Sequence, residues 1–89
     1  MNFNPFKVKE IGTDKEFYFD CENIVKLSDT TIKISNIHED FIDEMFSFLK
    51  NKCQNFSYMR CENSIYIDFP SLSFFQIKKI SVFKEILMY

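Results

Sequence analysis

The first third of the chain alternates apolar with polar residues. In residues 6–11, Phe6 and Val8 alternate with Lys7 and Lys9, which is typical of a half-buried strand. "GTDK" at 12–15 contains the only glycine and predicts a turn. Over residues 16–27 one parity carries the apolar residues Phe17, Phe19, Cys21, Val25 and Leu27. This segment is either one long strand or two strands separated at Glu22–Asn23, and residues 31–35 predict a further short strand.

Apolar residues at three- and four-residue steps follow, which is the period of a helix. The residues on this predicted face are Phe41, Ile42, Met45, Phe46, Phe48, Leu49 and Cys53. Asn36 is a suitable N-cap, and Glu39 stands three residues later, as in a capping box. Acidic residues fill the first turns and lysines the last, which the helix dipole favours by about 0.3–1 kcal/mol per charge. The pattern predicts a helix over about 37–53.

The remaining third predicts a hairpin and a second helix. Apolar alternation on either side of Glu62–Asn63 indicates two strands, and Pro70 ends the second. Residues 71–88 carry a helical stripe of Leu72, Phe75, Ile80, Phe83, Ile86 and Leu87. This stripe favours a C-terminal helix of about 71–88. A strand over 74–80 is the alternative, because Phe, Ile and Val also favour strands.

These elements predict an α+β fold in one domain, residues 1–89: a small antiparallel sheet of four to five strands packed by the two helices. A chain of 89 residues buries only about 60–65% of the surface that it exposes when unfolded. Twelve Phe and four Tyr are more aromatic bulk than such a core readily hides. We therefore expect part of it to lie in an interface. The terminal "FKEILMY" predicts a homodimer in which Ile86, Met88 and Tyr89 meet a second copy.

The pattern Tyr-x-x-Cys-Glu-Asn occurs twice, at residues 18–23 and 58–63. Similarity fades directly after each copy, and the distance from the motif to the predicted helix differs, so the pattern does not indicate a duplicated unit. We interpret both Glu-Asn pairs as turns, since Asn tolerates positive φ.

Several chemistries are excluded or disfavoured by composition and spacing. A single glycine cannot build a phosphate loop, a dinucleotide fingerprint or a nucleophile elbow. Cys21, Cys53, Cys61 and His38 are suitable zinc ligands, but no two cysteines stand in a close pair. Nothing in the sequence brings a particular cysteine to His38 for catalysis. The start resembles no secretory signal and no run of about 18 apolar residues occurs, so we expect a cytoplasmic protein without metal or cofactor.

The net charge of −2 hides a strong polarity along the chain. Residues 1–44 carry ten acidic side chains and five lysines, whereas residues 45–89 carry three acidic and six basic side chains. Glu39, Asp40, Asp43 and Glu44 crowd the start of the first predicted helix. They are either a solvated face, a contact for a basic protein surface, or, without calcium-loop spacing, ligands of a hard cation.

The sequence therefore predicts a small non-enzymatic binding or regulatory protein of the adaptor or inhibitor type, such as those encoded by mobile elements or acting as immunity partners. Its acidic helix start would steer it to a basic protein partner. The alternative is a nucleic-acid-binding module using Lys50, Lys52, Arg60, Lys78 and Lys79 together with aromatic residues. The pI of about 5.3 disfavours that alternative.

Overall fold

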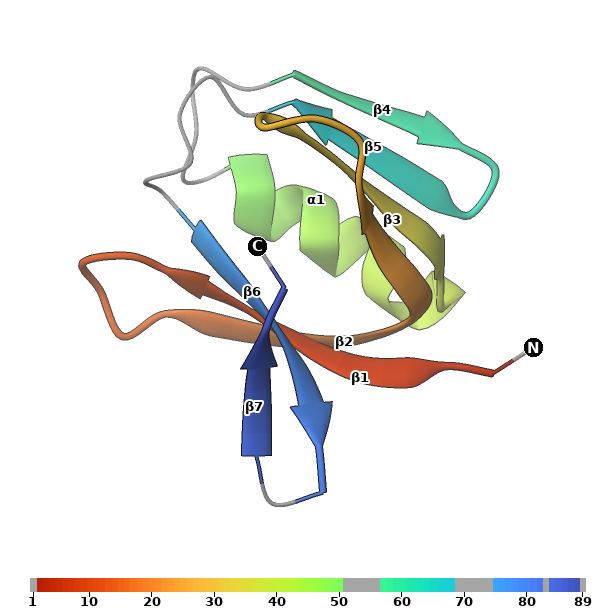
Figure 1. Cartoon of the computed structure of the whole chain (residues 1–89). Helices are drawn as coiled ribbons and strands as arrows, with labels where there is room; N and C mark the ends of the chain where they lie inside the picture. The colour runs from red at the N-terminus through yellow and green to blue at the C-terminus, as the bar shows by residue number, and fades with distance from the viewer. Residues whose placement is uncertain (1, 51–56, 69–74, 83, 89) are drawn as a thin grey trace.

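The computed structural model describes residues 2–50, 57–68, 75–82 and 84–88. These residues form β1 (Asn4–Glu10), β2 (Glu16–Lys26), β3 (Thr31–Ile37), a 3-10 turn η1 (Glu39–Phe41), α1 (Ile42–Lys50), β4 (Ser57–Cys61), β5 (Ser64–Asp68), β6 (Phe75–Ser81) and β7 (Lys84–Leu87). The seven described strands make one sheet in the order β4-β5-β3-β2-β1-β6-β7, and every neighbouring pair is antiparallel (Figure 1).

The long strand β2 joins the two halves of the sheet. Its first part pairs with β1 and its second part with β3, and Cys21 takes part in both pairings. Cys21 is buried, but the next buried residue is Ile24, so the core-facing parity changes at Glu22–Asn23. The sequence alternatives are thus resolved as one strand with a bend. Val25 and Leu27, which the pattern placed on the core side, are exposed because they follow this change of parity.

The facing strand β3 bends at the same level. Asn36 has a φ of 49° and opposes Glu22, between the registered pairs Cys21–Ile37 and Asn23–Ser35. Its side-chain amide donates a hydrogen bond to the Glu22 carboxylate. Asn36 is therefore a strand residue at a bend and not the predicted helix cap. The left-handed backbone at Asn36, which Asn tolerates better than most residues, coincides with the change of parity in both β3 and β2.

One apolar cluster lies on the concave side of the bent sheet. α1 lies across this side, between the half formed by β3, β5 and β4 and the half formed by β1 and β6 (Figure 1). Ile42 and Met45 are buried, and Phe41, Phe46 and Phe48 are partly buried against the cluster, which confirms these positions of the predicted helix face. The strand residues of the cluster are Phe6, Val8, Phe19, Cys21, Ile24, Ile32, Ile34, Ile37, Ile65, Ile67, Phe75 and Ile77.

The helix is shorter than predicted at its start. Residue 37 still belongs to β3, and the turn η1 precedes α1, which begins at Ile42. His38 takes the capping position, and its Nδ1 accepts a hydrogen bond from the Asp40 N–H at 3.2 Å. The β3 ladder, which pairs Ile37 with Cys21, outcompetes an earlier helix start. Residues 51–53 of the predicted helix lie outside the described residues.

The predicted C-terminal helix is wrong over Phe75–Ser81 and Lys84–Leu87, where the chain forms β6 and β7 instead. β6 pairs with β1 over Phe6–Glu10, and Phe75 and Ile77 both face the core with Gln76 between them. This two-residue alternation competes with the helical stripe, and the backbone ladder on β1 decides for the strand. The strand alternative over 74–80 was therefore correct for residues 75–80, whereas β7 was not predicted, and residues 71–74 lie outside the described residues.

The predicted hairpin around Glu62–Asn63 is confirmed as β4 and β5, with Glu62 at a φ of 55°. The fold class is corrected: the described residues form a seven-stranded antiparallel sheet with one short α-helix, in place of four to five strands packed by two helices. The two additional strands come from the C-terminal segment that the pattern assigned to a helix.

Candidate protein-binding surfaces

Four carboxylates stand at the start of the helical segment. Glu39 and Asp40 belong to η1 and Asp43 and Glu44 to the first turn of α1, and all four are exposed. We call these four residues the acidic face. Within the described residues, Glu39, Asp43 and Glu44 form no ion pair. Asp40 lies 3.6 Å from Nδ1 of His38, an ion pair only when His38 is protonated. Among the described residues, only His38 thus offsets the negative charge of the acidic face.

A hollow of about 200 Å³ borders the acidic face. It is lined by Phe3, Asn36, Ile37, His38, Glu39 and Asn63. The bend of the sheet places these residues together, because the Ile37 N–H donates to the Asn63 carbonyl at 2.8 Å and the His38 N–H donates to the Asp20 carbonyl at 2.8 Å. The ring of His38 lies 5.0 Å from Phe3 and 6.0 Å from Phe41. The hollow thus has aromatic walls beside the carboxylates of the acidic face.

Sequence reasoning identified Glu39 and His38 but missed Phe3, Ile37 and Asn63 as neighbours. The turn at Asn63 was predicted, yet its contact with Ile37 joins residues far apart in the chain. That contact depends on the pairing of β5 with β3, which the pattern of either strand alone does not specify.

The structure distributes the predicted basic residues over separate elements. Lys50 ends α1, Arg60 lies on β4, and Lys78 and Lys79 lie on β6, five strands away from β4 in the sheet order. Lys78 and Lys79 are consecutive strand residues and point to opposite faces. Lys78 is 3.4 Å from Glu85, and the Arg60 Nε donates to the Glu62 carbonyl at 2.7 Å. Lys52 lies outside the described residues.

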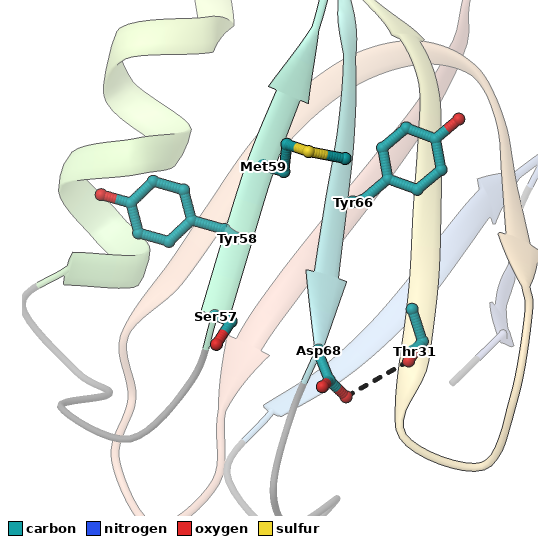
Figure 2. A pocket seen from close by; sticks show the side chains of 6 residues that line it. All are labelled: Thr31, Ser57, Tyr58, Met59, Tyr66 and Asp68. Atoms are coloured by element: carbon teal, nitrogen blue, oxygen red, sulfur yellow. Dashed lines mark hydrogen bonds between the residues drawn. The ribbon is translucent and has the colours of Figure 1, made fainter.

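Both edges of the sheet are exposed. On the β4 edge, a hollow of about 150 Å³ is lined by Thr31, Ser57, Tyr58, Met59, Tyr66 and Asp68. The Thr31 hydroxyl donates a hydrogen bond to the Asp68 carboxylate (Figure 2). The Tyr58 side chain points toward α1, away from Met59 (Figure 2). Tyr58 lies 5.0 Å from the ring of Phe46. Every residue of β7, on the other edge, is exposed.

A lysine is buried where the alternation pattern predicted a solvated one. Lys7 points away from the apolar cluster, opposite Tyr18 on β2 and Lys78 on β6. Its ammonium group pairs with the Glu85 carboxylate and lies 3.6 Å from Glu16. The hydrogen bond with Glu85 raises the pKa of Lys7, and the same bond lowers the pKa of Glu85. No local pattern could reveal this site, because it needs β7 beside β6.

The described cysteines lie in different environments. Cys21 is buried, and its burial raises the pKa of the thiol to about 12. Cys61 is exposed at the end of β4, and Cys53 lies outside the described residues. Among the residues that the structure describes, no three His, Cys, Asp or Glu side chains gather as a metal site would require.

Comparison with known proteins identifies no relative. No protein-family model, curated protein or solved structure matches this chain. In the described part of the chain, no helix is long and apolar enough to cross a membrane.

Proposed function

We propose that this protein is a small non-enzymatic binding or regulatory protein, of the adaptor or inhibitor type, whose acidic face engages a basic surface of a protein partner. The observation that carries the proposal is the set of exposed carboxylates Glu39, Asp43 and Glu44, which have no ion-pair partner among the described residues, beside a hollow with aromatic walls. Like charges grouped on one surface speed encounter with an oppositely charged one and disfavour other partners.

The hollow supplies a shape to which a basic side chain is suited. A lysine or arginine places an apolar stem against rings and keeps its charged group near carboxylates or solvent. Phe3 is partly exposed, and a cation over its ring would add a favourable interaction. Glu39 lines the hollow and belongs to the acidic face, so one partner side chain can contact both.

The experiment compares two double variants with the same change in charge. Asp43→Lys with Glu44→Lys reverses half of the acidic face, and Asp14→Lys with Asp29→Lys reverses two exposed carboxylates elsewhere. Immobilised protein is incubated with nuclease-treated lysate of the source cell or its host, and retained proteins are identified by mass spectrometry. The affinity of the identified partner is then measured for each variant.

We expect a stoichiometric protein that the wild type and the Asp14/Asp29 variant retain. The Asp43/Glu44 variant should bind it at least about tenfold more weakly, because two like charges then face the basic partner. Moderate salt should weaken wild-type binding. Equal binding by both double variants, or retention of no protein, would contradict the proposal.

A further inference from the structure

We propose that β7 pairs with β7 of a second copy of this chain, in antiparallel register about a two-fold axis at Ile86. In the described sheet, β7 is an edge strand that pairs only with β6. Ile86, Leu87 and Met88 are exposed by 40%, 60% and 36%. Three consecutive exposed apolar residues on a sheet edge favour pairing with another strand. This inference is independent of the acidic face.

The hydrogen-bond phase of β7 is fixed by its hairpin. The Met88 N–H donates to the Ile77 carbonyl at 2.8 Å, so Met88 bonds to β6. In an antiparallel ladder every second residue bonds to a given neighbour, which makes Ile86 and Lys84 bond to β6 as well. The backbone N–H and C=O groups of Glu85 and Leu87 therefore point away from β6, toward the edge.

The backbone groups of Glu85 and Leu87 point to the edge, and those of Ile86 between them point to β6. This arrangement lets β7 pair with an identical strand related by a two-fold axis. With the axis at Ile86, Glu85 opposes Leu87 of the second copy and Leu87 opposes its Glu85. Each of the two pairs exchanges two backbone hydrogen bonds, giving four in total. A register with Glu85 opposite Glu85 would place two carboxylates face to face, which is unfavourable. A register with Leu87 opposite Leu87 joins only one of these outward pairs.

The carboxylate of Glu85 on this edge does not oppose the pairing. Edge strands are commonly protected by charged side chains that repel a second strand. The Glu85 carboxylate, however, pairs with Lys7 and Lys78 of its own sheet. It is thus compensated within the chain, and the two Ile86 side chains meet at the axis with Met88 opposite Lys84 on the same face.

The contact is small, so we expect a weak dimer. A four-residue strand pair buries less than the roughly 1,200–2,000 Å² of a standard interface, which points to a dissociation constant of about 10 μM to 1 mM. Sedimentation at increasing concentration up to about 1 mM measures it. A wild-type protein that stays monomeric at about 1 mM would overturn the proposal.

A charged residue at the two-fold axis tests whether β7 forms the dimer contact. Ile86→Lys places two ammonium groups opposite each other and should abolish the dimer. Val82→Lys adds the same charge to the adjacent turn, at the more exposed side chain, and should leave the dissociation constant within about twofold. Persistence of the dimer in Ile86→Lys would overturn the proposal.

Cross-linking tests the register. In a background of Cys53→Ser and Cys61→Ser, Ile86→Cys brings two thiols together across the axis at a Cα separation of about 4.5 Å, within disulfide range. Leu87→Cys, although more exposed, opposes Glu85 and lies beyond about 7 Å from its own copy. With oxidised glutathione, we expect disulfide-linked dimer from Ile86→Cys at least about tenfold faster than from Leu87→Cys. Equal rates, or faster linkage of Leu87→Cys, would overturn the register.

Discussion

At the scale of single residues, the most informative side chain is Lys7. Because side chains alternate along β1, Lys7 points to the face of the sheet away from Phe6 and Val8. The alternation pattern predicted that this face would be exposed to solvent. The Lys7 side chain is only 7% exposed, because neighbouring strands surround it with Glu16, Tyr18 and Glu85. A buried ammonium group needs such partners, since an uncompensated buried charge is costly. The ion pair of Lys7 on β1 with Glu85 therefore connects the edge strand β7 to a strand inside the sheet.

Glu85→Gln should lower stability most in the middle of the pH range. The folded-state pKa of Glu85 lies below its ordinary 4.5, so its contribution is present above that value and is lost as pH falls through the folded pKa. The pKa of Lys7 lies above its ordinary 10.5, so its contribution is full below that value and is lost at higher pH. Urea unfolding at a series of pH values measures the difference between wild type and variant.

We expect this difference to be largest between about pH 4.5 and 10.5 and to shrink on further acidification. Glu62→Gln, at an exposed turn position, is the matched control and should show little difference at any pH. A difference that is constant from pH 7 down to pH 2 would contradict the ion pair as its cause.

At the scale of elements, the bend shared by β2 and β3 organises the molecule. It turns the second half of the sheet over the helix and brings the Asn63 turn to Ile37, which builds the hollow beside the acidic face. Both Glu-Asn pairs were interpreted as turns. The second pair is a hairpin turn, whereas the first lies inside β2, where the facing residue Asn36 takes the left-handed backbone.

Asn36→Val should destabilise the fold by about 1–2 kcal/mol, because a β-branched residue is strained at a φ of 49°. Ser35→Val, one residue earlier in the same strand, suits extended backbone and should change stability by less than about 0.5 kcal/mol. Asn36→Gly keeps the backbone freedom and should cost less than Asn36→Val. Chemical denaturation of the three variants measures this order. Equal stability of Asn36→Val and Ser35→Val would show that the bend does not depend on Asn36.

At the scale of the whole molecule, the sequence predicted correctly those elements whose formation depends on local periodicity. The helix face from Phe41 to Phe48 and the hairpin at Glu62–Asn63 are such cases. The prediction for the C-terminal segment was wrong because Phe75, Ile80, Ile86 and Leu87 fit a helical stripe. Phe75 and Ile77 are the residues that face the core, and they do so because β6 pairs with β1. The acidic residues were visible in the sequence, but the hollow and the Lys7 site depend on strand order.

The two halves of the sheet should unfold as one unit, because they share β2 and one apolar cluster. Ile77→Val on β6 and Ile65→Val on β5 each remove one buried methylene and should each cost about 0.5–1.5 kcal/mol. Leu27→Val, at an exposed position, should cost less than about 0.5 kcal/mol.

Native-state hydrogen exchange measures how far the destabilisation caused by each variant spreads through the sheet. A loss of about 1 kcal/mol in Ile77→Val should reduce the protection of the slowest amides of β1 and of β5 by the same factor of about five. If Ile77→Val accelerated exchange in β1 and β6 but left β5 unchanged, the halves would open separately and the bend at Glu22 and Asn36 would act as a hinge.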